Sequence, residues 1–291
     1  MHINELIITE NLVRALILDQ TPWFAHEKLE RYAGIGTVNA IFRIGDKHYM
    51  RMPRLPEWSL DIENEWNILK MVEGRLSIKT PKPVFLGKPS EEYPLHWAIH
   101  EWIDGQDYSE ATIKKEEEEA RRLSLFVNQM HSIKLDASVQ KAGRKPLKDL
   151  YGETVEAIHQ SRDFIDAKRT EKAWESLALA PEWDSDPVFI HGDLLRTNIL
   201  AKNGSIYAVI DFGSSGAGDP AHDLIPAWTV FSNKGRDAFL NGVGLPDAVV
   251  ERAKGYALHQ ALLIIPYYIK SYGYFSKLAI RTVNEILSET D

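Results

Sequence analysis

Hydrophobic and polar positions alternate with a strand-like period along the first third of the chain. Residues 28–54 contain several short apolar runs separated by turn signals, which predicts a small antiparallel sheet. Two further strands are predicted near 83–87 and 96–103. Between these regions, apolar residues recur at helical spacing from Pro56 to Gly74, so we expect one helix to pack against the sheet.

The pattern changes to a helical period after the Asp104-Gly105 turn. A helix capped by Ser109 should run to about His131, and amphipathic segments follow near 151–180. The chain beyond residue 221 is mostly helical in pattern. Strands followed by helices predict an α+β fold.

We expect these two regions to form two lobes. The predicted N-terminal lobe, residues 1–103, is a small antiparallel sheet with one helix. The predicted C-terminal lobe, residues 104–291, is larger and mostly helical. A chain of 291 residues is long enough for such a bilobal arrangement.

Composition and charge narrow the classes of function. With 34 basic and 42 acidic residues the formal charge is −8, and no basic stripe is present, so no nucleic-acid partner is expected. The absence of cysteine excludes disulfides, thiolate nucleophiles and Cys-ligated zinc. The chain begins without a secretory signal and contains no apolar run of membrane-spanning length. These features predict a cytoplasmic protein without a membrane partner, as a monomer or weak dimer.

The segment HGDLLRTNILAKNGSIYAVIDFG, residues 191–213, combines apolar runs with polar side chains. Carboxylates and amides are unfavourable beside a buried strand unless they have partners. Its Asn-Gly pair at 203–204 predicts a hairpin with a type I′ turn. Pairing through that turn sets Val209 opposite Asn198. Asp211 then projects from the same face of the hairpin as Asn198, at roughly 7 Å.

An amide oxygen and a carboxylate at that separation suit one Mg²⁺ ion, which prefers oxygen ligands and takes few of them from protein. Asn198 and Asp211 are therefore the candidate metal ligands. Asp193, five residues before Asn198, could accept a proton from an incoming hydroxyl. His191 has a simpler alternative role, that of a structural side chain that pins the loop.

A buried carboxylate is predicted on the helix that follows Pro56. Glu65 falls on the apolar stripe of that helix, where a carboxylate needs a cationic partner. The strand before it supplies Arg51, which should face away from Met50 and Met52. The alternative is that Glu65 extends to solvent at the edge of the stripe.

The spacing H-x-D-x-x-x-x-N, followed by a hydrophobic strand and D-F-G, matches the catalytic and metal loops of kinases. The runs HGDLLRTN, IDFG and GDPAHDL resemble the aminoglycoside phosphotransferase family, small-molecule kinases that share the protein-kinase fold. The resemblance extends to GIGTVNAIFRI, YMRMP and EWIDG, and Gly192 stands where protein kinases have arginine.

The resemblance implies a role for each matched position. Asp193 would be the catalytic base, and Asn198 and Asp211 the Mg²⁺ ligands. The family's ATP or GTP donor would be bound by a phosphate loop at Gly34, Gly36, Thr37 and Asn39 and by an adenine-binding hinge at Glu101, Trp102 and Ile103. Arg51, paired with Glu65, would contact the phosphates. Asp219 and Asp223 are expected to cap and anchor the segment after the metal loop.

One position departs from the family pattern. The family usually carries lysine where this chain has Arg51, and the macrolide phosphotransferases resemble this chain there, with a similar arginine-proline run. The leading hypothesis is transfer of a γ-phosphoryl group to a hydroxyl of a small molecule, an aminoglycoside-type antibiotic above all. Alternatives are a macrolide phosphotransferase, a kinase of a small metabolite, a nucleotide-binding pseudokinase or interaction module, and a protein kinase.

Overall fold

The computed structural model describes residues 5–32, 39–271 and 273–289. Contacts divide the chain into two compact units, which we take in turn. Unit 1 comprises Met1–Gly105 and Ala208–Ser214, and unit 2 comprises Gln106–Tyr207 and Ser215–Asp291.

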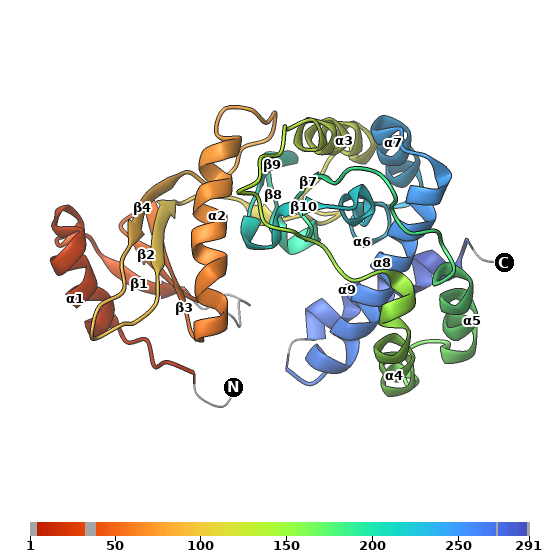
Figure 1. Ribbon diagram of the computed structural model, residues 1–291, viewed down its shortest axis with the longest axis horizontal. Coiled ribbons are helices and arrows are strands. Elements are labelled where there is room, and N and C mark those ends of the chain that lie inside the picture. Colours follow the sequence, from red (N-terminus) through yellow and green to blue (C-terminus); the bar gives the residue numbers. More distant parts are fainter. Residues whose placement is uncertain (1–4, 33–38, 272, 290–291) are drawn as a thin grey trace. The chain divides into compact units, whose positions relative to one another are not determined.

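Unit 1 is built on a five-stranded antiparallel sheet of order β1-β2-β3-β5-β4. Figure 1 shows this sheet between two helices, α1 and α2. The predicted strands and the predicted helix are confirmed. The elements of unit 1 are α1 (Glu10–Gln20), β1 (Leu29–Tyr32), β2 (Asn39–Ile44), β3 (His48–Pro53), α2 (Ser59–Val72), β4 (Pro83–Gly87) and β5 (Trp97–Glu101).

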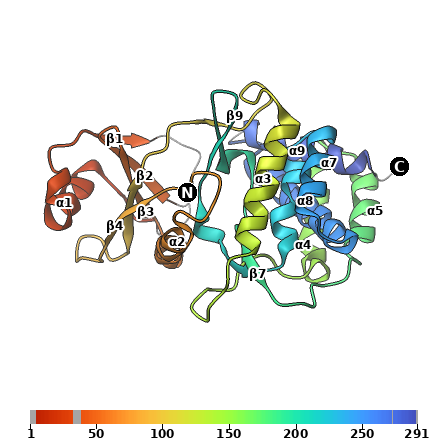
Figure 2. The same ribbon diagram turned by 90° about the horizontal axis from the view of Figure 1, so that it is seen from above.

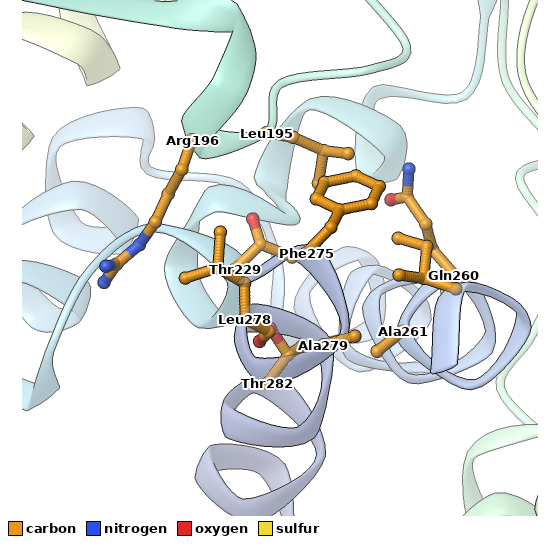
Figure 3. Close-up of a pocket in the computed structure, with 10 residues that line it drawn as sticks. Leu195, Arg196, Thr229, Gln260, Ala261, Phe275, Leu278, Ala279 and Thr282 are labelled. Carbon is orange, nitrogen blue, oxygen red and sulfur yellow. The ribbon is translucent and has the colours of Figure 1, made fainter. Parts of the chain in front are cut away.

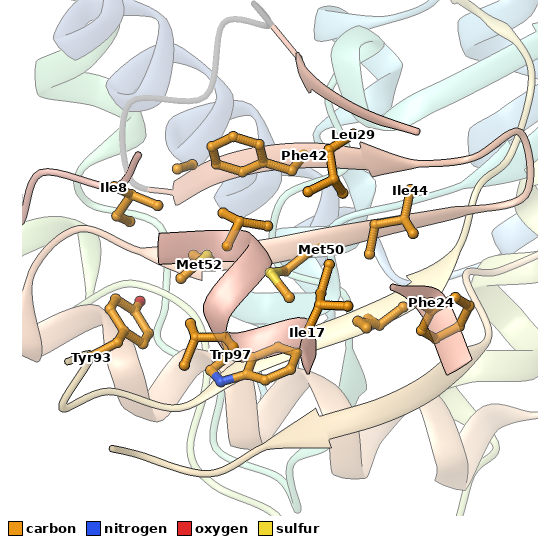
Figure 4. Packing of buried hydrophobic residues seen from close by; sticks show 14 of the residues in the cluster. Ile8, Ile17, Phe24, Leu29, Phe42, Ile44, Met50, Met52, Tyr93 and Trp97 are labelled. Atoms are coloured by element: carbon orange, nitrogen blue, oxygen red, sulfur yellow. The ribbon is translucent and has the colours of Figure 1, made fainter. Parts of the chain in front are cut away.

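The core of unit 1 lies between α1 and one face of the sheet (Figure 4). Met50 and Met52 of β3 are fully buried in it, beside Trp97 of β5. Arg51, between the two methionines, contacts α2 on the opposite face of the sheet. The alternation predicted for this strand is therefore confirmed.

Helix α1 was not expected, because the sequence interpretation gave this lobe a single helix. The hydroxyl of Thr9 caps it by accepting from the backbone N–H of Leu12 at 3.2 Å. Val13, Leu16 and Ile17 form a buried stripe at helical spacing. The sequence interpretation assigned no element before residue 28, although the apolar run at 12–18 carries the helical spacing.

Unit 2 is mostly helical, as predicted. Figure 2 shows its helices α3, α7, α8 and α9, among which α3 packs on α7 and α8 packs on α9. Two small sheets accompany them, with orders β6-β8-β9 and β10-β7. The elements are β6 (Gln106–Asp107), α3 (Glu116–His131), α4 (Tyr151–Ser161), α5 (Ala167–Leu177), β7 (Val188–Ile190), β8 (Ile199–Lys202), β9 (Ser205–Val209), β10 (Gly216–Gly218), α6 (Pro226–Thr229), α7 (Asn233–Val243), α8 (Asp247–Tyr268) and α9 (Gly273–Leu287).

The start of α3 differs from the prediction. Ser109 does not cap it, because its backbone N–H donates to the Thr112 hydroxyl in a separate turn at 2.8 Å. Lys114 then donates its N–H to the carbonyl of Gly204 at 3.0 Å. These bonds hold the segment against the turn of the β8-β9 hairpin, so the helix begins only at Glu116.

The β8-β9 turn has the predicted geometry. Asn203 has φ 59° and Gly204 has φ 92°, the pair of positive values that a type I′ turn requires. The hairpin that carries the polar segment is therefore confirmed. Among the residues that the structure describes, none of the helices has the length and apolarity needed to cross a bilayer.

Candidate active site

Two amide side chains hold the carboxylate of Asp193. Asn198 donates its Nδ2 to Asp193 Oδ2 at 2.9 Å and also to the Asp193 backbone carbonyl at 2.8 Å. Gln260 of α8 donates its Nε2 to Asp193 Oδ1 at 2.8 Å. Because both carboxylate oxygens accept hydrogen bonds from these amides, the orientation of the side chain is fixed.

The loop that carries Asp193 is tied to a buried aspartate. Asp223 accepts the backbone N–H of His191 at 3.0 Å and that of Gly192 at 2.9 Å. Gly192 has φ 78°, so a residue without Cβ suits the position where protein kinases have arginine. Burial raises the pKa of Asp223, but hydrogen bonding and charge from His131, with the Gly192 N–H, hold it below its ordinary value.

The capping and anchoring roles expected for Asp219 and Asp223 agree with the structure, and so does the structural alternative for His191. Asp219 caps the 3₁₀ helix that follows it by accepting from Ala221 N, and it also pairs with Arg252 at 2.8 Å. His191 is fully buried, and its Nδ1 accepts from the backbone N–H of Asp193 at 3.3 Å. The loop geometry around Asp193 is thus set by side chains distant in sequence.

Unit 1 contains a cluster centred on Arg51. Its Nη1 donates to both oxygens of Glu65 at 2.9 and 3.0 Å and to Asp211 Oδ1 at 2.9 Å. The other edge of the guanidinium faces Asn39, whose amide oxygen, in the orientation that this cation requires, accepts from Nη2 at 3.0 Å and Nε at 2.9 Å. The predicted Arg51–Glu65 pair is confirmed, and the solvent-exposed alternative for Glu65 is wrong, since Glu65 is 1% exposed.

The electrostatics of this cluster follow from burial and pairing. Burial lowers the pKa of Arg51, but the charges of Asp211 and Glu65 outweigh it and hold the pKa above its ordinary value. Burial raises the pKa of Glu65, while Arg51 opposes the rise. The backbone N–H of Phe212 also donates to Glu65 at 3.1 Å, which favours the carboxylate.

The strand argument for the metal ligands is wrong in its local geometry. Asn198 ends a 3₁₀ turn, Arg196–Asn198, rather than lying in β8. Asp211 lies beyond the end of β9 with φ 66°, a left-handed conformation rare for a residue with a side chain. Neither residue therefore obeys the strand alternation from which their common face was deduced. Such strained backbone often occurs at functional sites.

Each of these two side chains, taken by itself, has an oxygen of the kind that hard cations prefer. Asn198 turns its nitrogen to Asp193, so its Oδ1 is the atom that can coordinate. The side chain of Asp211 is 45% exposed, which leaves oxygen surface for a ligand. Among the described residues, no three His, Asp or Glu side chains gather to hold a metal, whereas these two positions offer one amide and one carboxylate.

The predicted hinge lies at the end of β5. The backbone N–H of Glu101 donates to Lys82 O at 2.9 Å and that of Trp102 to Lys47 O at 2.7 Å. The Trp102 ring packs edge-on to Tyr49 at 5.9 Å. The proposed phosphate-loop residues Gly34, Gly36 and Thr37 lie outside the described residues.

Sequence reasoning missed three side chains near these groups. Gln260 holds Asp193, and Arg144 interacts electrostatically with it, which partly offsets the lowering of the Arg144 pKa by burial. Asp61 lies near Arg51 and Asp211, and burial raises its pKa. The signal for Gln260 was a polar residue in the apolar run ALHQALLII, whereas Arg144 and Asp61 gave no distinctive signal.

The sequence of the chain matches a known family over most of its length. The model of the phosphotransferase enzyme family, APH, matches residues 31–255. The chain belongs to this family. It is accordingly a small-molecule phosphotransferase. No curated protein matches the chain in a sequence search.

Solved structures share the fold. The GDP and kanamycin complex of the aminoglycoside phosphotransferase APH(2'')-IIIa superposes with a TM-score of 0.74 at 17% identity, covering 96% of this chain and 99% of that one. The streptomycin and ATP ternary complex of APH(2'')-IIa has a TM-score of 0.62 at 18% identity, covering 97% of each chain. The macrolide 2'-phosphotransferase MphH from Brachybacterium faecium has a TM-score of 0.61 at 18% identity, covering 95% and 98%. The α+β, kinase-like fold is therefore established.

Proposed function

We propose that this phosphotransferase moves the γ-phosphoryl group of ATP or GTP, in the presence of Mg²⁺, to a hydroxyl of a small molecule. The observation that carries the proposal is the fixed carboxylate of Asp193, held through both oxygens by Asn198 and Gln260. A carboxylate with this orientation is suited to align a hydroxyl and accept its proton, an effect worth about 10²- to 10⁴-fold in rate.

The phosphates of the donor are assigned to unit 1. Arg51, oriented by Glu65 and Asn39, presents a cation to phosphate oxygens. Gly34, Gly36 and Thr37 are proposed to form the phosphate loop together with Asn39. The backbone of Glu101, Trp102 and Ile103 is proposed to bind the adenine or guanine ring.

Asn198 and Asp211 are proposed to hold the magnesium ion through one oxygen each. The bound cation would bridge phosphate oxygens and offset their charge during transfer. Arg51 donates to Asp211 and so restricts where that carboxylate can turn.

The acceptor is an alcohol of small size. The sequence resemblance favours an aminoglycoside-type antibiotic, and a macrolide or a metabolic alcohol is the alternative. Solved relatives support both antibiotic classes, because their complexes and names include aminoglycoside and macrolide enzymes.

The test is phosphoryl transfer from labelled Mg-ATP and Mg-GTP to a panel of aminoglycosides, macrolides and metabolic alcohols. Wild type should form a phosphorylated product, and Asp193→Asn should lower kcat at least about a hundredfold because the proton acceptor is lost. Asp163→Asn, an exposed substitution of the same kind, should behave like wild type. Nucleotide binding by wild type without transfer to any acceptor would instead identify a binding module.

A further inference from the structure

Arg144 lies in the loop that joins α3 to α4, and its backbone is anchored within unit 2. Its N–H donates to His222 Nε2 at 2.7 Å. Two residues earlier, the N–H of Ala142 donates to the carbonyl of Ala217 in β10 at 2.9 Å. The imidazole of His222 stacks in turn on the ring of Tyr256 in α8, with centroids 4.0 Å apart. The position of Arg144 is therefore set by packing against neighbouring elements.

Helix α8 also holds the proposed base. Tyr256, which contacts His222, and Gln260, which donates to Asp193, are four residues apart, so they lie one turn from each other on the same face of the helix. Figure 3 shows Gln260 on α8 and Leu195, two residues after Asp193, lining the same small pocket. One face of α8 thus brings the Arg144 loop and the Asp193 loop together.

The guanidinium of Arg144 extends along this face of α8. Its charge interacts with Asp193 and Tyr256, and it also acts on the buried rings of His222 and His259. Burial, with this charge as the next cause, lowers the pKa of each histidine to about 4, so both rings are neutral at neutral pH. Arg144 therefore brings a cation to the surroundings of Asp193, whereas the two histidines do not.

This guanidinium has no hydrogen bond or ion pair within the part of the chain that the structure describes, although Arg144 is only partly exposed. The buried arginines of unit 2 differ, because each has a carboxylate partner; they are Arg196, Arg236 and Arg252. A guanidinium presents its N–H donors in a planar fork that matches two oxygens of a phosphate. Arg144 can therefore bind an oxyanion without first breaking a bond within the protein.

The proposed reaction creates such an oxyanion beside Asp193. The acceptor hydroxyl gives its proton to Asp193, and its oxygen forms a bond to the γ-phosphorus. The bond from that phosphorus to the β,γ-bridging oxygen breaks, and the nucleoside diphosphate leaves with the electron pair. A neutral hydroxyl is thus replaced by a phosphate monoester that carries about two negative charges at neutral pH. A nearby cation stabilises this product group more than it stabilises the hydroxyl.

We propose that the guanidinium of Arg144 binds the phosphoryl group as it reaches the acceptor oxygen and keeps that contact while the product is bound. This inference rests on the proposed function and adds a charge-stabilising residue to it. Because the contact forms with the phosphoryl group and not with the hydroxyl, it should accelerate transfer and strengthen product binding without changing the affinity for the acceptor.

Arg144→Met tests the proposal, since methionine keeps an unbranched apolar stem and the backbone bond to His222 does not need the guanidinium. The acceptor is one that the panel identifies, and the nucleotide is saturating. The rate of a single turnover should fall at least about tenfold, as expected for the loss of a charge-assisted hydrogen bond, while KM for the acceptor changes less than about threefold. Arg144→Lys keeps the charge and should recover part of the rate. Arg162→Met, at an exposed position of the same unit, should behave like wild type.

Binding without turnover gives a second readout. The phosphorylated product, purified from the wild-type reaction, and the unmodified acceptor are titrated with each variant by ligand-observed NMR in the absence of nucleotide. Arg144→Met should weaken binding of the product at least about tenfold and leave binding of the acceptor as in wild type. Arg162→Met should change neither affinity.

Wild-type transfer rate and product affinity in Arg144→Met would overturn the inference. Equal weakening of acceptor and product would also overturn it, because Arg144 would then shape the site as a whole. A loss confined to acceptors that carry an acid group of their own would overturn it too, since the guanidinium would then bind that group.

Failure of the proposed function gives a different result. If no acceptor of the panel is phosphorylated, that function is rejected, and inorganic phosphate followed by phosphorus NMR tests the anion site by itself. Weaker binding of inorganic phosphate by Arg144→Met than by wild type and Arg162→Met would support an oxyanion site at Arg144. Equal binding by the three proteins would overturn it.

Discussion

Arg51 uses both edges of its guanidinium. One edge donates to Glu65 and Asp211, and the other faces the amide oxygen of Asn39. A lysine ammonium is a single point donor and cannot reach both sides in the same way. The arginine at the usual lysine position is therefore part of a specific local network.

Arg51→Lys should weaken Mg-nucleotide binding about tenfold and lower the free energy of unfolding by about 1.5–3 kcal/mol, the range for hydrogen bonds to charged groups. Calorimetric titration and chemical denaturation measure the two effects. Arg75→Lys, at an exposed position, is the control. Unchanged nucleotide affinity in Arg51→Lys would show that the guanidinium of Arg51 does not contribute to phosphate binding.

His100 is a buried histidine whose two ring nitrogens have no hydrogen-bond partner within the described residues. Its ring stacks on Tyr49 at 5.3 Å. Burial, with a smaller contribution from Arg51, lowers the pKa of His100 to about 3 from an ordinary value of 6.5. The folded protein therefore keeps this ring neutral, whereas the unfolded chain binds a proton below pH 6.5.

Stability from this residue is fully present above pH 6.5 and is lost as the pH falls toward 3, by about 2 kcal/mol between pH 6.5 and 5. His100→Phe should remove that loss, so the variant should gain relative stability as the pH is lowered. Urea denaturation at pH 7.5 and pH 5 measures the difference. His159→Phe, at an exposed position, should leave the pH dependence as in wild type, and a parallel pH dependence in both variants would contradict the prediction.

At the scale of the element, the β8-β9 hairpin depends on its turn. Gly204 has φ 92°, and a Cβ there would meet the side chain of Lys114 at 2.6 Å. Gly74 has φ 71°, but nothing lies within 4 Å of its would-be Cβ. The two glycines therefore separate the cost of the backbone conformation from that of the contact.

Gly74→Ala should cost about 1–2 kcal/mol, the usual penalty for a left-handed residue with a side chain. Gly204→Ala should cost more, because Lys114 must also move. Thermal and urea unfolding of both variants gives the comparison. An equal cost would mean that Lys114 adjusts without loss.

Elements with a clear period were predictable from the chain. The strands of unit 1, the helix α2 and the β8-β9 turn follow from local alternation and from one Asn-Gly pair. The start of α3 was not predictable, because Lys114 donates a hydrogen bond to Gly204, a residue 90 positions further along the sequence.

The residues of the candidate site also divide into those that local sequence predicts and those that it does not. Asp193, Asn198 and Asp211 could be predicted from the sequence because they belong to one motif of fixed spacing. Glu65 could be predicted because it is a carboxylate on the apolar stripe of a helix. Gln260 was hidden because its contact with Asp193 spans 67 residues and is created only by the packing of α8. The argument that Asp211 continues the strand alternation was wrong, because its left-handed backbone conformation ends the strand pattern.

At the scale of the whole molecule, nucleotide binding should be visible as stabilisation. Mg-ATP or Mg-GTP at about a hundred times its Kd should add about 2.7 kcal/mol, roughly 5–10 °C in Tm for a chain of this size. EDTA should remove most of the shift, and Asp211→Asn should reduce it. A shift that survives both treatments would contradict magnesium binding through Asp211.

The second segment of unit 1, Ala208–Ser214, has a consequence for the order in which the protein matures. Lys79 O accepts from Val209 N at 2.9 Å, Glu65 accepts from Phe212 N, and Arg51 donates to Asp211. These three contacts of unit 1 therefore require residues that are synthesised 130 to 160 positions later. During synthesis on the ribosome the first 105 residues are therefore made before the partners of Lys79, Glu65 and Arg51 in this segment exist. The N-terminal unit can reach its final form only after nearly three-quarters of the chain has been translated.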